Sequence, residues 1–386
     1  MQISECGMTG VSPDLQPALE EKTMSIKIFL LPAILIVFYA HPFPVSASEN
    51  IRVAVLDNQK TITVQSERGL VLEGMRPGRR EKTMIFSASY GGTRPARVRS
   101  EGEFTRLNGA DYRGWIEIRK KKNGLFLVVN DLDMEDYLMG VVAEEIPCDW
   151  EFDALKAQAV ASRTYALYQK KNSGKRPYHV LATVKGQVYS GRRGERASTV
   201  RAVRETGGLV LVYNGKVISA FYHSSCGGHT EDAFEIWGID APYLKGVDCG
   251  CQEISKYGVW EKRFTMKSIA LSLGKLGYRL KDISGLDIGS ITAAGRVREV
   301  ALKHAGGTTN LPAETLRQAL GYSQVPSVFF EPMASGAEVV FSGRGLGHGV
   351  GLCQWGAKEM AQKGFDFKAI LGRYYPGTKV VRMEEL

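Results

Sequence analysis

Two adjacent glutamates, Glu144 and Glu145, stand in the stretch GVVAEEIPCDW and could donate or accept protons. Leu138, Val141 and Val142 form an apolar stripe if this segment is helical. Glu145 continues the stripe, whereas Glu144 points about 100° away from it. A carboxyl on an apolar stripe loses hydration, which favours its neutral form and raises its pKa. Since a general acid must be protonated near neutral pH, Glu145 is a candidate catalytic acid.

The end of this predicted helix decides whether a substrate could reach the carboxyl. Residues 132–146 have a helical pattern, and Asp133 is a suitable N-cap. Ile146 precedes Pro147, a position that resists helical backbone angles, so the helix should end at Glu145. A side chain at a helix end can border a cleft. The alternative, a carboxylate held in a structural salt bridge, stays open from this pattern alone.

The next helical pattern, DALKAQAVASRTYALYQ, carries two cations on one face. Lys156 and Arg163 share this face with Val160 and Leu167, and alanines along the segment let neighbours pack close. Both cations could therefore point toward an acid or an acidic substrate. The alternative is that they are solvated surface groups.

The stretch FSGRGLGHGVGLCQWGAKEMAQKG contains five glycines within residues 343–351, a density that neither a helix nor a regular strand tolerates. A loop of this kind lets another chain or a ligand approach the backbone closely. Arg344, His348 and Gln354 are therefore candidates for binding a sugar or a carboxylate. A tight structural turn with an internally bonded histidine is the competing interpretation.

Histidines and cysteines gather in FYHSSCGGHTED, where His223, Cys226 and His229 have H-x2-C-x2-H spacing. With Cys249 and Cys251 downstream, these residues offer enough nitrogen and sulfur donors for a zinc site. The spacing matches no standard zinc site, and an exported protein meets oxidising conditions. A disulfide from Cys226 to Cys249 or Cys251 is therefore the preferred expectation, with zinc as the alternative and no other cofactor.

The elements that position these residues indicate an α+β fold with mixed antiparallel sheets and a few packed helices around a central cleft. Residues 51–130 contain short β-like runs, and helical patterns follow. Asn214-Gly215 between two alternating apolar runs predicts a hairpin. We expect a β-rich segment at 48–130 that continues into a core at 131–386 within the same domain.

The N-terminus predicts export to the periplasm or cell envelope. From Met24 the chain has one lysine, an apolar run too short to span a bilayer, and small residues up to Ala47. Residues 1–47 therefore form a leader with a signal peptide at 24–47, and no later segment is expected to span a membrane. The formal net charge is +9, which favours an anionic polymer. The basic runs lack the interleaved aromatics of a nucleic-acid site, so we expect no nucleic-acid partner.

Four ordered segments together resemble the SpoIID/LytB family of stage II sporulation protein D and the amidase enhancers. They are residues 128–167, GQVYSG at 186–191, residues 221–247 and GRGLGHGVGLCQWGAKEMA followed by YYPGT. The resemblance implies an exported lytic transglycosylase that cleaves MurNAc–GlcNAc linkages of denuded peptidoglycan in cell-wall remodelling, and it leaves a link to sporulation open. Glu145 would be its catalytic residue, and His223 and Ser224 join the expected substrate-binding set.

The resemblance also leaves an alternative function and carries one departure. A non-catalytic protein that binds peptidoglycan and enhances an N-acetylmuramoyl-L-alanine amidase would share these segments. Some sporulation members hold zinc in a His/Cys-rich segment before the QVY triplet. Here that segment keeps His179 but has Lys185-Gly186 where a His-Cys pair is expected, so that zinc site should be absent.

Overall fold

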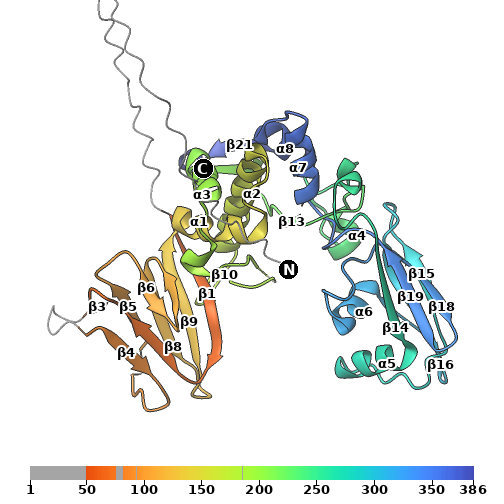
Figure 1. Ribbon diagram of the computed structural model, residues 1–386, viewed down its shortest axis with the longest axis horizontal. Coiled ribbons are helices and arrows are strands. Elements are labelled where there is room, and N and C mark those ends of the chain that lie inside the picture. The colour runs from red at the N-terminus through yellow and green to blue at the C-terminus, as the bar shows by residue number, and fades with distance from the viewer. Residues whose placement is uncertain (1–48, 75–80, 93, 185) are drawn as a thin grey trace, which may run out of the picture.

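The computed structural model describes residues 49–74, 81–92, 94–184 and 186–386. Their buried apolar side chains form three clusters that follow one another along the molecule. Figure 1 shows a β-rich unit at one end, helices in the middle and a second β-containing unit at the other end. The predicted leader, residues 1–47, lies outside the described residues. Within the described ranges, no helix combines the length and apolar character needed to cross a bilayer.

The N-terminal unit consists of two sheets, as the β-like runs of residues 51–130 predict. The first has the strand order β10-β1-β9-β8-β5-β3 and is antiparallel except where β10 joins β1. Its strands are β1 (Asn50–Gln59), β3 (Leu70–Leu72), β5 (Ala96–Ser100), β8 (Trp115–Lys120), β9 (Phe126–Asp133) and β10 (Val180–Leu181). The second sheet, in the order β4-β2-β6-β7, consists of β2 (Ile62–Gln65), β4 (Thr83–Phe86), β6 (Thr105–Leu107) and β7 (Ala110–Tyr112).

Three helices cover this unit, and the first two correspond to the helical patterns of the sequence. Helix α1 (Met134–Glu145) follows β9 directly, and the Asp133 carboxylate caps it by accepting from the first-turn backbone N–H groups. It ends at Glu145 because Ile146, before Pro147, has extended angles of φ −136° and ψ 152°. The other two are α2 (Phe152–Lys171) and α3 (Ala197–Glu205), with the 3₁₀ turn η1 (Gly191–Gly194) before α3.

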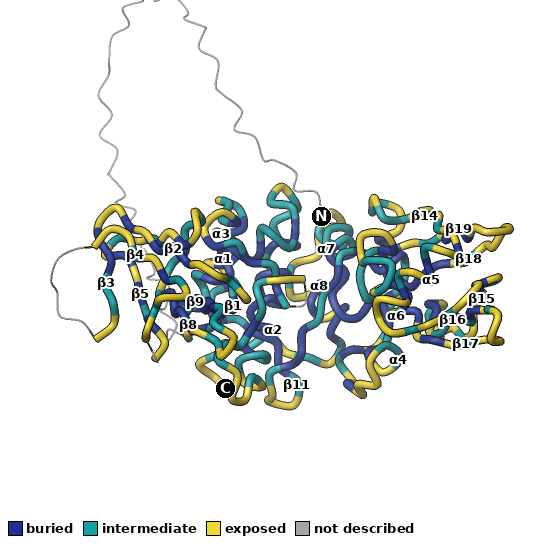
Figure 2. The backbone as a smooth tube through the Cα atoms, turned by 90° about the horizontal axis from the view of Figure 1, so that it is seen from below, coloured by how far each residue is buried: buried dark blue, intermediate teal, exposed yellow. Residues whose placement is uncertain are grey.

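The middle of the molecule is built on α2, which contributes to the first two cores and is largely buried in Figure 2. The same part of the molecule contains a three-stranded sheet, a parallel strand pair β13–β20 and three shorter helices, of which α7 and α8 pack on α2. These elements are β11 (Leu209–Tyr213), β12 (Lys216–Val217), β21 (Lys379–Arg382), β13 (Tyr222–His223), β20 (Leu352–Cys353), α4 (Ala233–Trp237), α7 (Gln354–Gln362) and α8 (Phe367–Tyr374). The 3₁₀ turns η2 (Gly250–Glu253) and η3 (Met383–Glu385) complete this part.

An inserted unit with its own core separates β13 from β20. It leaves the middle at Trp260 and returns at Gly343, which are paired residues of neighbouring strands. One sheet consists of β14 (Trp260–Thr265), β19 (Glu338–Gly343) and β18 (Phe330–Ser335), and the other of β15 (Gly285–Ile291), β16 (Val297–His304) and β17 (Gly307–Pro312). Helices α5 (Met266–Lys275) and α6 (Ala313–Leu320) pack on each other.

The α+β prediction is confirmed: helices and mostly antiparallel sheets make up the described chain. The hairpin is also confirmed, because Tyr213 pairs with Lys216 and both Asn214 and Gly215 have positive φ, at 49° and 71°. The second strand is shorter than expected. It ends at Val217, and the downstream Tyr222–His223 segment instead pairs in parallel with β20.

The glycines of the turn at 343–351 generate a stability prediction. Gly351 has φ +72°, and a Cβ there would lie 2.1 Å from the carbonyl oxygen of Phe221. Gly215 has φ +71° with nothing within 4 Å of its Cβ position. Gly215→Ala should therefore cost only the left-handed backbone term of about 1–2 kcal/mol.

Gly351→Ala should lower the free energy of unfolding by about 1–3 kcal/mol more than Gly215→Ala does, because its new methyl group overpacks the turn. Urea unfolding of both variants measures this difference. If both variants lost the same free energy of unfolding, the turn would not pack tightly against the strand that follows Phe221.

Candidate active site

The Glu145 carboxyl lies at the C-terminal end of α1 and remains partly exposed. Its Oε1 accepts a hydrogen bond from the backbone N–H of Val188 at 2.9 Å, and the Tyr222 hydroxyl also bonds to the carboxylate. Burial raises the pKa of Glu145 to about 7, because the desolvation outweighs these two hydrogen bonds to the charged form. The charge of the neighbouring Glu144 raises this pKa further. The carboxyl can therefore exist in either protonation state near neutral pH.

The neighbouring acid has a different environment. One carboxylate oxygen of Glu144 accepts a hydrogen bond from the Ser190 hydroxyl at 2.5 Å. The two glutamates thus contact different residues of the same 186–191 segment, as expected for side chains about 100° apart on a helix. Only Glu145 continues the buried stripe of Leu138, Val141 and Val142.

Buried polar groups orient the Tyr222 hydroxyl toward Glu145. The Gln187 side-chain amide donates to the Tyr222 oxygen at 3.1 Å and to the Ser162 carbonyl at 3.2 Å. The Gln187 side-chain carbonyl accepts from the Tyr137 hydroxyl at 3.2 Å. Because the phenol oxygen already accepts from Gln187, its own O–H can donate to the carboxylate. Tyr222 and Gln187 were not among the residues predicted from the sequence, although Gln187 stands in the GQVYSG segment.

His348 connects the glycine-rich turn to this network. Its Nδ1 accepts from the backbone N–H of Val350 at 3.1 Å, so Nε2 carries the proton and donates to the Tyr222 carbonyl, also at 3.1 Å. Burial, reinforced by the neighbouring His223, holds the pKa of His348 well below its usual range. The ring is therefore neutral and fully hydrogen-bonded, which supports a positioning role and leaves neither ring nitrogen for a substrate.

The glycines explain how the turn approaches this site. Gly345, Gly347, Gly349 and Gly351 all have positive φ. A Cβ at Gly347 would lie 2.8 Å from the Cβ of His223, so the two segments meet at backbone contact distance. The segment is therefore a tight turn with an internally bonded histidine, which was the competing interpretation of its sequence pattern.

Both predicted cationic side chains of α2 form ion pairs with acidic residues of the protein. Arg163 is fully buried, and its guanidinium makes two 2.7 Å hydrogen bonds with the Glu135 carboxylate. A substrate cannot reach it, so the structure corrects its assignment to substrate binding: this is a structural ion pair. Lys156 is partly exposed, lies 3.2 Å from Glu205 and sits over the Phe152 ring.

The remaining predicted substrate-binding residues divide by exposure. Gln354 is buried and its amide donates to Gln158 at 3.4 Å. His223 is buried, with Nδ1 3.1 Å from the Val350 carbonyl. Ser224 is partly exposed, and its backbone carbonyl accepts from a residue of α7. Arg344 is exposed, so it is the cation of this set most open to solvent.

The cysteines come together in a way that the sequence did not predict. Among the described residues, Cys226, Cys249, Cys251 and Cys353 form a buried cluster (the cysteine cluster) in which every sulfur lies within 4.8 Å of the others. Cys353 was absent from the expected set. The predicted disulfide from Cys226 is not formed.

The side chains of the H-x2-C-x2-H sequence do not converge to form one set of metal ligands. His223 bonds to a backbone carbonyl, and His229 bonds through Nδ1 to the Thr230 carbonyl with Nε2 3.7 Å from Asp248. Neither histidine belongs to the metal-ligand group that contains Cys226. The structure therefore corrects the alternative zinc set of His223, Cys226 and His229.

Two family models match parts of this chain. A family model described as a stage II sporulation protein matches residues 122–213, the part that contains Glu145 and Gln187. A second model, a domain of unknown function, matches residues 245–351, which include the inserted unit and the glycine-rich turn.

Curated relatives extend the similarity over most of the chain. An uncharacterized protein of Brachyspira hyodysenteriae is 33% identical over 333 residues, covering 85% of this chain and 84% of the relative. Stage II sporulation protein D of Bacillus subtilis is 32% identical, covering 65% of this chain and 75% of the relative. The amidase enhancer of Bacillus subtilis is 30% identical over 62% of this chain, and the match spans only 40% of that longer protein.

Fold and site together define an α+β protein in which a helix end presents one carboxyl with a pKa near neutrality to a partly open surface. The chain belongs to the stage II sporulation protein D family, as its coverage of these relatives shows.

The raised pKa of Glu145 predicts a pH-dependent stability difference. An unfolded glutamate ionises near 4.5, whereas Glu145 in the folded protein ionises near 7. Folding is therefore penalised progressively as pH rises from about 4.5 to 7, and fully above this range, by up to about 3 kcal/mol. Glu145→Gln removes the penalty, so the variant should gain stability relative to the wild type at pH 8 but not at pH 4.

The measurement is chemical unfolding of both proteins at the two pH values. Glu144→Gln is the matched control: its charge is the smallest of the contributions to the pKa of Glu145, so its stability should change far less between the two pH values. A stability difference for Glu145→Gln that does not change with pH would contradict the raised pKa.

Proposed function

We propose that this protein is a peptidoglycan lytic transglycosylase that acts with Glu145 as its single acid–base residue. The observation that carries the proposal is a partly exposed carboxyl whose pKa lies near 7 and whose charged form has two positioned hydrogen-bond donors. The relatives named stage II sporulation protein D and amidase enhancer support a role at the cell wall connected with sporulation.

The proposed reaction uses both protonation states of one carboxyl. Protonated Glu145 first donates its proton to the glycosidic oxygen between MurNAc and GlcNAc, and the C1–O bond breaks. The carboxylate that results accepts hydrogen bonds from Val188 N–H and the Tyr222 hydroxyl. It then removes the proton from the muramoyl C6 hydroxyl, whose oxygen bonds to C1 and closes a 1,6-anhydro ring. The carboxyl ends protonated, so no water is consumed and no second carboxylate acts as nucleophile or base.

The charge of the chain suits this substrate. Glycan strands without stem peptides expose the lactyl carboxylates of muramic acid, and a net charge of +9 favours association with such a polyanion. Arg344 on the glycine-rich turn is exposed and is the candidate for contacting a lactyl group. The proposal also requires export, for which the leader is the sequence evidence.

A second candidate function is a non-catalytic peptidoglycan-binding protein that enhances an N-acetylmuramoyl-L-alanine amidase. The name of the Bacillus subtilis amidase enhancer favours it. In that case the Glu145 network would be structural, and loss of its carboxyl would leave the stimulation of an amidase unchanged.

Replacement of the acid distinguishes the two functions. Glu145→Gln should lower the release of 1,6-anhydro products from denuded sacculi by at least about 100-fold, the scale of a lost general acid. Glu144→Gln should keep most of the activity, because the carboxyl at that position contacts Ser190 instead. The assay is mass spectrometry of the soluble products.

Three outcomes of this assay would contradict the proposed reaction. Glycan products with reducing ends would indicate hydrolysis instead. Equal activity of Glu145→Gln and wild type would remove Glu145 from the reaction. No glycan cleavage by the wild type, with stimulation of an amidase in both proteins, would support the enhancer function.

Tyr222 provides a prediction about the pH profile. Its hydrogen bond lowers the pKa of Glu145, so Tyr222→Phe should raise that pKa and shift the alkaline limb of the activity profile to higher pH. Tyr165→Phe is the control: its ring lies 6.3 Å from that of Tyr222 between centroids, but the hydrogen bonds that lower the pKa of Glu145 come from Val188 and Tyr222. An alkaline limb that stays in place in Tyr222→Phe would show that the phenol does not act on the acid.

A further inference from the structure

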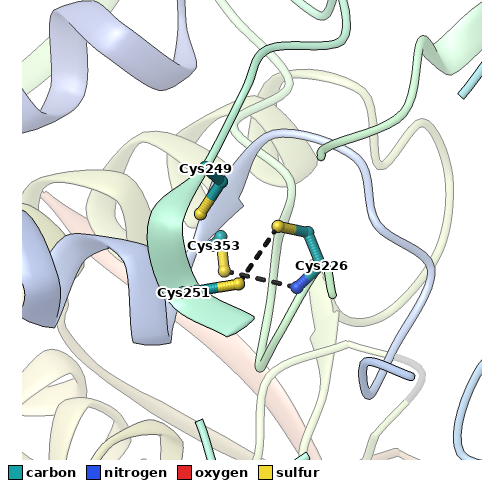
Figure 3. Close-up of side chains that lie close together, drawn as sticks. All are labelled: Cys226, Cys249, Cys251 and Cys353. Atoms are coloured by element: carbon teal, nitrogen blue, oxygen red, sulfur yellow. Dashed lines mark hydrogen bonds between the residues drawn. The ribbon is translucent and has the colours of Figure 1, made fainter. Parts of the chain in front are cut away.

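Four cysteines from three separate segments converge in the middle of the molecule. Cys226 follows β13, Cys249 and Cys251 flank the start of η2, and Cys353 ends β20. Figure 3 shows their side chains pointing toward one another, and all four residues are buried. Every pair of sulfurs lies within 4.8 Å.

This spacing fits one tetrahedral metal ion. A zinc–thiolate bond of about 2.3 Å places the sulfurs of a tetrahedron about 3.8 Å apart. A polynuclear iron–sulfur cluster separates its cysteines further, because iron and inorganic sulfide lie between them. The limit of 4.8 Å for every pair therefore matches a single ion more closely than a cluster. Thiolate ligands favour soft or borderline ions such as Zn²⁺.

The groups around the sulfurs are those that a thiolate site needs. The backbone N–H groups of Cys226 and Gly356 donate to the sulfur of Cys353, at 3.3 and 3.4 Å. The Tyr374 hydroxyl lies 3.2 Å from the sulfur of Cys249. Such outer hydrogen bonds orient metal ligands and stabilise their negative charge. A Cβ at Gly356 would lie 2.4 Å from the Cys249 sulfur, so α7 packs against the cluster with no room for a side chain at this position.

A buried cation accompanies the cluster. Arg296 is 1% exposed, and its guanidinium donates to the Cys226 carbonyl at 2.7 Å. Its Nη1 lies 3.5 Å from a carboxylate oxygen of the buried Glu231, with which it forms an ion pair. The charge of Arg296 is thus already balanced by Glu231, and the arginine anchors the Cys226 segment through its main-chain carbonyl.

We infer that the cysteine cluster is a structural site for one tetrahedral divalent ion of the Zn²⁺ type. All four positions of the ion would be filled by protein sulfur, which leaves none for a substrate and indicates a structural role. The site is separate from the His/Cys-rich segment before the QVY triplet, where this chain lacks the cysteine.

The position of the cluster indicates what the ion would stabilise. Cys353 pairs with His223, and Leu352 pairs with Tyr222, in the short parallel ladder of β13 and β20. Two-residue strands contribute few backbone hydrogen bonds, so a metal bridge between their ends would fix their register. Tyr222 donates to Glu145 from this ladder. The ion would therefore hold the segments that orient the carboxyl without taking part in its chemistry.

The test measures metal and thiol content in the full chain purified without chelators. Elemental analysis should find about one zinc per chain, and Co²⁺ exchanged into the protein should show the sulfur-to-cobalt charge-transfer absorption of tetrahedral thiolate coordination. Alkylation should reach the four cysteines only after unfolding with a chelator. None of these readouts depends on glycan cleavage, so the inference and the proposed function can fail separately.

Single substitutions provide the controls. Cys251→Ser and Cys353→Ser should weaken metal binding by at least about 10–100-fold and lower the unfolding temperature. Cys148→Ser should retain the metal, because Cys148 does not belong to the cluster. If a cluster variant does not fold, the metal and thiol content of the wild type still decides the question.

Several results would overturn the inference. Metal-free protein with the four sulfurs in disulfides, seen as resistance to alkylation until a reductant is added, would show that oxidation fills this site. Iron found together with inorganic sulfide would replace the single ion with an iron–sulfur cluster. Equal zinc content in wild type, Cys251→Ser and Cys353→Ser would place the metal elsewhere.

Discussion

The arrangement of the middle of this molecule depends on the desolvation of one carboxyl. Burial alone would raise the pKa of Glu145 further, and full exposure would leave the carboxyl ionised at neutral pH. The Val188 N–H and the Tyr222 hydroxyl oppose the effect of burial and hold the pKa near 7. This balance requires that the segments containing Val188 and Tyr222, both distant in sequence from α1, each place one hydrogen-bond donor at the carboxylate. The Gln187 amide and His348 serve that requirement, since both bind Tyr222.

Those parts of the site that depend on local geometry could be predicted from the sequence. The apolar stripe and the position of Pro147 placed Glu145 at a helix end, because periodicity and the restriction before proline act within a few residues. The hairpin at Asn214-Gly215 and the irregular glycine-rich turn followed from backbone preferences of the same range.

The parts that depend on long-range packing could not be predicted in this way. Arg163 lies on the predicted helix face, but that face packs into the core, where Glu135 already binds it. Cys353 joins Cys226 across 127 positions of sequence, and no spacing rule connects them. The Tyr222 hydroxyl reaches the acid because β13 pairs with β20 in parallel instead of extending the upstream hairpin.

The inserted unit has a consequence for how proteins of this architecture can diversify. Its first and last paired residues, Trp260 and Gly343, are neighbours, and the Trp260 indole also donates to the Gly345 carbonyl at 3.0 Å. The chain therefore enters and leaves the inserted unit at neighbouring positions. Evolution could replace or remodel this unit without changing the rest of the fold. Because the exit strand continues directly into the turn that bears His348, each exchanged unit would stay attached to the segment that bonds to the Tyr222 carbonyl.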